Sequence, residues 1–350
     1  MVRLSARSRF IRRLTMLAAL IAVPVAPPAA IATPAAAQSP ATGAMEQLLD
    51  YVRHQNTTGF LVIQDRKVLV EKNWPAPDDP QFRLFTYERN KDGALLEDVA
   101  SQQKSFVSML VAIAIDKGLI DVRRPVSSYL GAGWSKAAPG QEAEIKVINL
   151  LNMNSGLGTD YRYQAPPGTV FLYNTQVYAI AKRVVAAAAR QPLETITHDW
   201  LTGPAGMVDT AWRKRPAAFV DVGNPTGLVT SPRDVARFGQ ILLDGGRAAD
   251  GRRIVSEDSL TAMFERSPTN PSYGRLWWLN GSAYTVRPTG RHDGPLIAAA
   301  PADLVGALGA LDRRLFVVPS RKLIVVRMGN AVDDKDFDQQ LWLRLDKVIG

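Results

Sequence analysis

Short apolar runs near both ends of the chain predict β-strands. Residues 58–70 hold two such runs, GFLVI and VLV, separated by the polar turn QDRK, a pattern typical of a hairpin. From Leu276 onward the runs RLWWL, RLFVVP and KLIVVRMG are separated by turn residues, and a helical pattern follows from Asp334 to the end. The chain is therefore expected to form one sheet from both of its ends.

The segment between these strands has the pattern of helices. Residues 106–115, FVSMLVAIAI, are apolar on nearly every face and are followed by Lys117 and Gly118, which predicts a buried central helix that ends there. Cap, periodicity and stop signals predict further helices over residues 175–190, 231–246 and 256–265. No internal repeat or interdomain linker is visible, so a helical insertion within one domain is expected.

The first 37 residues have the composition of a cleavable export signal. Five arginines precede residue 14, an apolar run extends from Leu14 to Val25, and Pro- and Ala-rich sequence ends at Ala37. A membrane span needs about 20 apolar residues, so this shorter run predicts a signal peptide with a cut before Gln38, and a periplasmic or secreted mature protein. A permanent anchor is the alternative. Arg12-Arg13 is only a weak indication of a twin-arginine route.

Composition narrows the chemistry. The chain has no Cys, which excludes disulfides, Cys nucleophiles and thiolate metal sites. It has only three His, so we expect no multi-His metal site. Its net charge is +9, but removal of the five leader arginines leaves 37 basic against 33 acidic residues, a net of +4. These charges are interspersed, so we expect solvated faces and no nucleic-acid partner.

One pair of residues carries a candidate reaction. The motifs G-x-S-x-G, H-E-x-x-H, G-x-G-x-x-G and the Walker loop are absent, whereas Ser101 and Lys104 stand three residues apart at the head of the buried helix. This spacing places both side chains on one helical face, where a lysine of lowered pKa could accept the serine proton. The pair alone is weak, because a capping serine followed by a surface lysine has the same spacing.

The surrounding sequence resembles the serine β-lactamase and penicillin-binding-protein superfamily, specifically its class C-like branch, which also contains esterases and 6-aminohexanoate-oligomer hydrolases. The likeness extends from about residue 45 to the end of the chain. Its blocks, in family order, are DVASQQKSFVSMLVAIAIDKGLI, INLLNMNSGL, PPGTVFLYNTQVYAIA, GLVTSPRDVARFGQILLDGG, YGRLWWL and APADLVGALGALDRRLFVVPSRKLIVVRMG.

The resemblance implies roles for individual residues. Ser101 is the acylated nucleophile, Lys104 its proton partner and Tyr173 the tyrosine of the branch's Y-x-N element, where a phenolate could serve as general base. Thr175 stands where β-lactamases have Asn, with Asn174 in the middle, and both are candidate substrate-binding residues; this departure puts β-lactam recognition in doubt. Three other tyrosines compete with Tyr173: Tyr161, Tyr163 and Tyr178.

The family's K-T-G or H-T-G element is absent as such. Alignment on RRLFVVP places Ala307-Leu308-Gly309 at that position, and the resemblance implies that Gly309 and Ala310 bind substrate, the Ala310 N–H forming an oxyanion hole with the N–H of Ser101. No cation stands at that position to hold a substrate carboxylate. Neutral esters or amides are therefore favoured, unless a distant arginine such as Arg291 or Arg313 reaches the cleft.

Several neighbouring residues remain open. His292 imitates an H-x-G element at the wrong spacing and is interpreted as a loop residue, and the effect of Arg313, where relatives often have Gln, is not predicted. Trp277 and Trp278 fit the core better than an acyl pocket.

The predicted fold is α/β (α+β), β-lactamase/transpeptidase-like, with an antiparallel sheet flanked by helices plus an all-helical subdomain. After a signal peptide at 1–37, one catalytic domain spans 38–350, with a sheet subdomain at about 45–105 and 270–350 and a helical subdomain at about 106–269. We expect an exported serine hydrolase of a small ester or amide, without cofactor, metal or stable membrane span. The alternative is a penicillin-binding or β-lactamase-type protein that acts on, or merely binds, β-lactams or peptidoglycan peptides.

Overall fold

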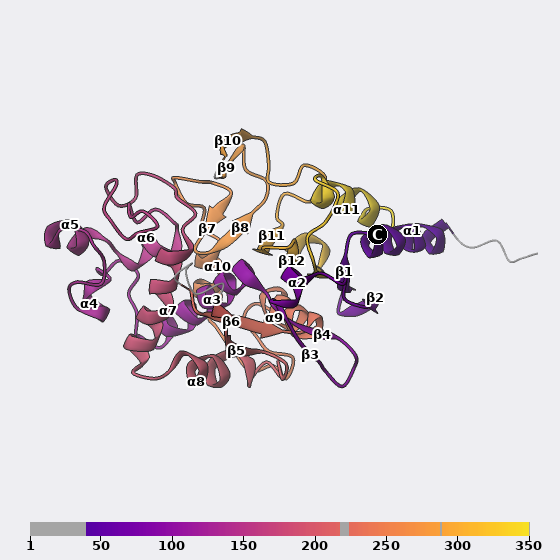
Figure 1. Cartoon of the computed structure of the whole chain (residues 1–350), viewed down its shortest axis with the longest axis horizontal. Helices are drawn as coiled ribbons and strands as arrows, with labels where there is room; N and C mark the ends of the chain where they lie inside the picture. The colour runs from indigo at the N-terminus through magenta and orange to yellow at the C-terminus, as the bar shows by residue number, and fades with distance from the viewer. Residues whose placement is uncertain (1–39, 218–223, 288, 350) are drawn as a thin grey trace, which may run out of the picture. The chain divides into compact units, whose positions relative to one another are not determined.

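A seven-stranded antiparallel sheet is the centre of the structure (Figure 1), in the order β2-β1-β13-β12-β11-β8-β7. The computed structural model describes residues 40–217, 224–287 and 289–349, so the predicted signal peptide and its cleavage site lie outside the described residues. The strands of this sheet are β1 (Thr57–Gln64), β2 (Lys67–Asn73), β7 (Tyr273–Gly274), β8 (Trp277–Leu279), β11 (Val305–Gly309), β12 (Arg313–Val318) and β13 (Leu323–Gly329).

The two ends of the chain meet in this sheet, as predicted. Strand β1 pairs with β2 on one side and with β13 on the other, with Leu61 opposite Val326. The predicted hairpin is thus confirmed, and so are the strands expected from the three apolar runs after residue 276.

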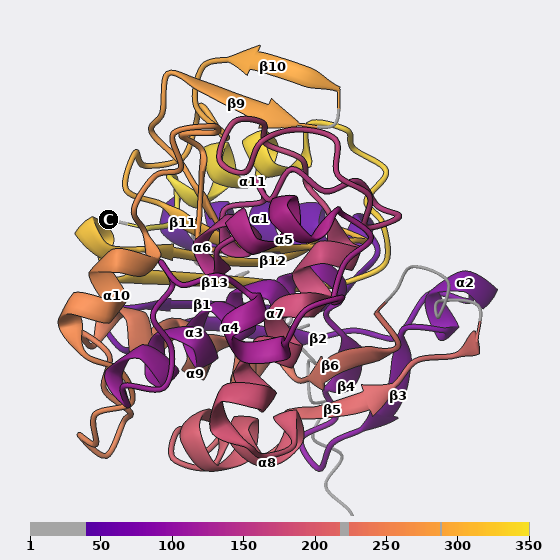
Figure 2. The same cartoon turned by 90° about the vertical axis from the view of Figure 1, so that its left-hand side faces the viewer.

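Helices cover both faces of the sheet (Figure 2). On one face, Phe60 and Phe316 pack with Trp342 of the C-terminal helix and with the N-terminal helix. On the other, Leu61 and Leu315 pack with Phe238 and the central helix. The helices are α1 (Pro40–His54), α2 (Pro80–Arg83), α3 (Gln103–Asp116), α4 (Ser127–Leu130), α5 (Pro139–Glu144), α6 (Val147–Leu151), α7 (Thr175–Ala189), α8 (Leu193–Thr197), α9 (Pro232–Leu243), α10 (Glu257–Met263) and α11 (Phe337–Leu345).

The predicted helices are present, and three begin at a side-chain cap. Asn174, Ser231 and Ser256 each accept a backbone N–H three residues on, which satisfies a donor left free at the start of α7, α9 and α10. Every residue of α3 from Gln103 to Ala114 is buried, as its apolar pattern predicted. In the described part of the chain, no helix is both long and apolar enough to cross a membrane.

A second, four-stranded sheet was not predicted. Its order is β3-β4-β6-β5, with β3 (Thr86–Arg89), β4 (Leu95–Asp98), β5 (Ala211–Lys214) and β6 (Thr226–Thr230). The segment predicted to be helical, 106–269, therefore also contains β5 and β6, and residues 45–54 of the predicted sheet segment belong to α1. Strands of four or five residues show too few alternations for a pattern to identify them. The third sheet is a projecting hairpin of β9 (Tyr284–Arg287) and β10 (Gly290–Asp293).

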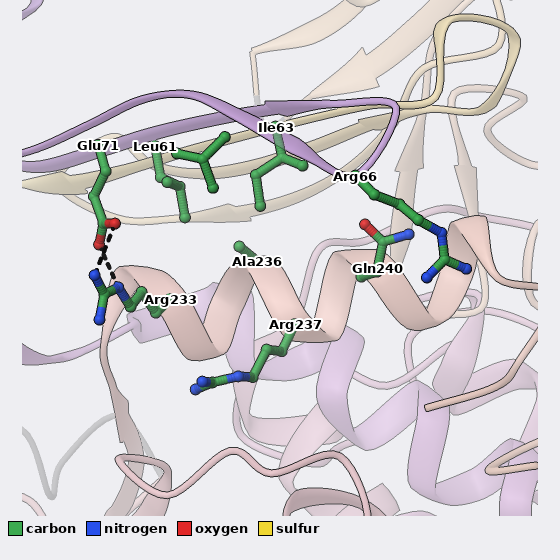
Figure 3. Close-up of a pocket in the computed structure, with 9 residues that line it drawn as sticks. Leu61, Ile63, Arg66, Glu71, Arg233, Ala236, Arg237 and Gln240 are labelled. Atoms are coloured by element: carbon green, nitrogen blue, oxygen red, sulfur yellow. Dashed lines mark hydrogen bonds and ion pairs between the residues drawn. The ribbon is translucent and has the colours of Figure 1, made fainter. Parts of the chain in front are cut away.

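Helix α9 is held close beneath the main sheet. A Cβ at Gly239 would lie 3.0 Å from Leu315 Cδ1, so only a very small residue permits this approach. Figure 3 shows Leu61 and Ile63 of β1 pointing toward α9 above a hollow of about 260 Å³, with Glu71 paired to Arg233 at one end. Ser101 does not line this hollow.

Candidate active site

Ser101 stands at a strained turn between a strand and the central helix. Strand β4 ends at Asp98, a turn of 3₁₀-helix spans Ala100–Gln102 (η1), and α3 follows. Ala100 has a φ of +49°, a conformation that is unfavourable for a residue with a Cβ. The Asp98 carboxylate accepts the Ala100 N–H at 2.8 Å, which helps to hold this turn and leaves Ser101 half-buried at the edge of a cleft.

Lys104 contacts Ser101, as its spacing predicted. Its Nζ lies 3.0 Å from Ser101 Oγ and 3.2 Å from Thr175 Oγ1, and the residue is 2% exposed. The same Nζ lies 4.9 Å from the ring centre of Tyr173 and 4.8 Å from that of Tyr178. Within residues 40–217, 224–287 and 289–349, no ion pair includes Lys104. The ammonium form is thus buried among hydroxyls and rings, without a carboxylate to stabilise it.

This environment lowers the pKa of Lys104 to about 7. Burial is the largest cause, and the positive charges of Arg215 and Lys182 add to it. A substantial fraction of Lys104 is therefore a neutral amine near neutral pH, and such an amine can accept the Ser101 proton.

The two neighbouring cations come from segments that showed no motif. Arg215 follows β5 and forms a bidentate pair with Asp98, with Nε–Oδ2 and Nη2–Oδ1 distances of 2.7 Å and 2.9 Å. Lys182 lies one helical turn beyond Tyr178 on α7 and is 7% exposed. Sequence reasoning missed Asp98, Lys182 and Arg215. The only available signal was a Lys on the predicted apolar face of α7, since the segment carrying Arg215 had no predicted element.

Tyr173 lies beside Ser101 in an aromatic cluster. Its ring stacks on Trp278 at a centroid distance of 5.7 Å and meets the edge of Tyr273 at 6.2 Å. Burial raises the pKa of Tyr173 to about 12, although a hydrogen bond with Ser101 acts in the opposite direction. The phenolate expected from the resemblance is thus unfavourable here, and the residue is a neutral phenol near pH 7.

The two residues after Tyr173 have different surroundings. Thr175 accepts a hydrogen bond from Lys104 and so lies beside the Ser101–Lys104 pair. Asn174 is 2% exposed; its Oδ1 accepts the Val177 N–H and its Nδ2 donates to the Leu157 carbonyl. Neither residue is among those that line the cleft at Ser101, and their role in substrate binding stays a prediction.

A cleft of about 400 Å³ opens at Ser101. Gly309 and Ala310 line it, as the oxyanion-hole prediction requires. A Cβ at Gly309 would lie 2.4 Å from the Val99 carbonyl oxygen, so glycine allows the end of β11 to approach the nucleophile turn. The lining residues are Ser101, Tyr173, Trp278, Arg287, Leu296, Leu308, Gly309, Ala310, Asp312, Arg314 and Asp338.

The cleft also contains cations that sequence reasoning did not expect. Arg287 is exposed and donates to the Leu296 carbonyl at 3.3 Å. Arg314 pairs with both Asp312 and Asp338 at 2.8 Å. No cation stands at Ala307-Leu308-Gly309 itself, but the assumption that no distant arginine reaches the cleft does not hold, because Arg287 and Arg314 line it. A linear alignment does not show how far a side chain extends across a hairpin.

The two arginines that sequence reasoning named lie elsewhere. Arg313 is fully buried and paired with Glu97, with an Nη2–Oε2 distance of 2.8 Å. Arg291 is an exposed residue of β10, 3.2 Å from Asp293.

The structure also shows where His292, Trp277 and Trp278 lie. His292 lies on exposed strand β10, not on a loop, and its Nε2 is 2.7 Å from Thr289 Oγ1. Trp277 is fully buried, as expected of a core residue, whereas Trp278 lines the cleft.

Comparisons with known proteins agree on the family of this chain. The family model described as "Beta-lactamase" matches residues 45–348. A 6-aminohexanoate-dimer hydrolase of Paenarthrobacter ureafaciens is 25% identical over 284 residues, which are 65% of this chain and 65% of that protein's length. The alignment therefore spans just under two thirds of this relative.

Solved structures share the fold. A family VIII carboxylesterase superposes with a TM-score of 0.64 at 16% identity, over 89% of this chain and 97% of the other. A beta-lactamase/D-alanine carboxypeptidase of Yersinia pestis, complexed with citrate, superposes with a TM-score of 0.63 at 15% identity, over 87% and 97%. These structures confirm the predicted β-lactamase/transpeptidase-like fold.

Proposed function

The chain belongs to the beta-lactamase family, and we propose that it is a serine hydrolase that cleaves a small ester or amide through an acyl-enzyme on Ser101. The observation that carries this proposal is the 3.0 Å contact between Ser101 Oγ and Lys104 Nζ at the edge of a cleft. A buried lysine of lowered pKa beside an accessible serine is an activated nucleophile pair. The relative that hydrolyses 6-aminohexanoate dimer and the carboxylesterase neighbour support this reaction class.

In the proposed acylation, neutral Lys104 accepts the Ser101 proton as Oγ attacks the substrate carbonyl carbon. The carbonyl oxygen becomes negative and is stabilised by the backbone N–H groups of Ser101 and Ala310. When the tetrahedral intermediate collapses, the bond to the alkoxide or amine breaks, and that leaving group takes a proton. Protonated Lys104 and the neutral phenol of Tyr173 are the available donors.

Deacylation reverses these proton movements. Lys104, neutral again once its proton has been given to the leaving group, accepts a proton from the attacking water. Ser101 Oγ then leaves the acyl carbon and regains a proton. We assign Tyr173 the role of a neutral hydrogen-bond donor and proton relay, since its raised pKa disfavours a standing phenolate.

The cleft favours a substrate that is apolar near the reacting bond. Trp278, Leu296 and Leu308 supply the apolar lining, and Arg287 and the Arg314 ion pairs supply charge. The absence of K-T-G supports esters and amides over β-lactams. We further propose that residues 1–37 direct export, on the basis of their composition.

A fluorophosphonate probe tests the proposed nucleophile. We expect the probe to label Ser101, identified by mass spectrometry, and p-nitrophenyl butyrate to be hydrolysed. Ser101→Ala should abolish both while costing at most about 1 kcal/mol of stability. Full labelling or turnover by that variant would place the nucleophile elsewhere. Nitrocefin and 6-aminohexanoate dimer, assayed on the same preparation, separate an esterase or amidase from a β-lactamase.

A further inference from the structure

Five successive carbonyl oxygens, from the last residue of β11 through the turn to the first residue of β12, are bound by three buried arginines. Arg314 donates to the Gly309 and Arg313 carbonyls at 3.4 Å and 3.2 Å. Arg313 donates to the Ala310 carbonyl at 3.1 Å. Arg327 of β13 donates to the Leu311 and Asp312 carbonyls at 2.8 Å and 3.1 Å. We call Arg313, Arg314 and Arg327 the arginine cradle.

The turn that the cradle binds has an unfavourable backbone. Leu311 and Asp312 have φ angles of +60° and +56°. A leucine rarely adopts this conformation, because its Cβ is crowded there. Such a conformation persists only where the surrounding structure fixes it, and the three arginines supply those contacts.

Carboxylates anchor the cradle to the nucleophile side of the site. Arg313 donates Nε–H to Glu97 Oε2 at 3.0 Å, and Glu97 also accepts the Thr58 hydroxyl. Glu97 lies on β4, the strand that leads into the turn at Ser101. The buried pair therefore joins the strand before the nucleophile to the turn that contains Ala310.

The charges of the cradle largely cancel. Glu97 compensates Arg313, while Asp312 and Asp338 both pair with Arg314. Arg327 donates to neutral oxygens, among them the Gln55 and Asn330 carbonyls. The cradle therefore acts on the turn mainly through directional hydrogen bonds, and its long-range positive field is small.

We propose that the three arginines are positioning residues for the oxyanion hole. By fixing the carbonyls of residues 309–313, they hold the turn so that the Ala310 N–H faces the oxygen that becomes negative during acyl transfer. This inference rests on the proposed hydrolase function. It also gives Arg313 a role: it supports the turn from beneath, in a chain whose corresponding strand has no K-T-G or H-T-G element.

The double variant Glu97→Gln/Arg313→Gln tests this proposal, because it removes both charges of the buried pair and leaves neither one unpaired. An oxyanion-hole donor contributes about 10²–10³ in kcat, so a misdirected donor should cost at least about tenfold. We expect kcat to fall by that factor while KM changes less than about twofold.

Inhibition by phenylboronic acid distinguishes a positioning role of the cradle from a purely structural role. Ser101 Oγ adds to boron, its proton passes to Lys104, and the resulting tetrahedral anion resembles the transition state. The inhibition constant should rise by the same factor as kcat falls. The matched control is Arg237→Gln, which removes the ion-pair partner of buried Asp234 and changes no residue of the turn. It should leave kcat and boronate affinity unchanged, whatever its melting temperature.

Arg313→Lys is the second test variant, to be used if the double variant does not fold. A lysine keeps the charge pair with Glu97 but lacks the planar fork that reaches both Glu97 and the Ala310 carbonyl. We expect a parallel loss of kcat and boronate affinity of at least about fivefold. A folded variant with wild-type values of both would overturn the cradle proposal. Turnover that survives Ser101→Ala would instead refute the proposed function, so the two failures are distinguishable.

Discussion

The ammonium groups of Lys104 and Lys182 lie 4.8 Å and 5.7 Å from the centre of the same buried ring, that of Tyr178. Lys182 donates to Asn224 Oδ1 and to the hydroxyl and carbonyl oxygens of Thr226, but burial, followed by the positive charge of Arg215, lowers the pKa of Lys182 to about 7 as well. Lys104 instead meets two hydroxyls, which can also donate to a neutral amine. The two lysines therefore titrate in the same pH range, and protonation of Lys182 opposes protonation of Lys104.

The first prediction concerns the pH dependence of the wild-type enzyme. The pKa of Lys104 is lowered to about 7, and only its neutral form can accept the Ser101 proton. For a neutral ester, kcat/KM should be nearly constant above about pH 8 and should fall as pH drops through about 7, because protonation removes the base. A pH–rate profile measured with p-nitrophenyl butyrate checks this. A flat profile between pH 5 and 8 would exclude Lys104 as the titrating base.

The second prediction concerns Lys182. Lys182→Met removes a group that is positively charged below about pH 7, so the pKa of Lys104 should rise and the acidic limb of kcat/KM should move upward by roughly half a pH unit. Lys182→Arg places a cation there at every pH tested and should leave the limb at or slightly below its wild-type position. If both variants have the wild-type limb, Lys182 does not act on Lys104.

Much of this site could be predicted because it lies within one continuous stretch. Ser101 and Lys104 meet through helical spacing alone, and the apolar pattern of residues 106–115 showed that their helix is buried. Tyr173 could be placed beside Ser101 only through the family resemblance, because its contact spans 72 positions of sequence.

The electrostatic surroundings could not be predicted in this way. Asp98 and Arg215 are 117 residues apart and meet because β4 and β5 both pair with β6, two short pairings that no periodicity indicated. The contacts of Arg313 and Arg314 depend on the register of the β11–β12 hairpin, since a shift of one residue would exchange the buried and cleft-lining arginines.

The third prediction compares two glycines of β11. Gly309→Ala should lower kcat and destabilise the fold by about 1–3 kcal/mol, because the new Cβ would lie 2.4 Å from the Val99 carbonyl oxygen and backbone must move. Gly306→Ala is the control, since its nearest neighbour is a leucine methyl at 3.3 Å that can shift. Thermal melts and kcat measurements on both variants check this. Equal losses would show that the close approach at Gly309 does not matter.

The last prediction concerns the charged part of the cleft. Arg287 lines the cleft and is exposed, so an ion pair with a substrate carboxylate should contribute no more than about 1 kcal/mol, or about fivefold in kcat/KM. Arg287→Ala should therefore lower kcat/KM about three- to fivefold for p-nitrophenyl monoglutarate, which has a terminal carboxylate, and leave p-nitrophenyl butyrate nearly unchanged. Arg291→Ala is the matched control, because Arg291 is exposed on the adjacent strand but outside the cleft lining. Equal losses on both esters would mean that Arg287 affects the shape of the cleft and does not bind a substrate carboxylate. The preference for neutral substrates, inferred from the missing K-T-G, would then need no correction for Arg287.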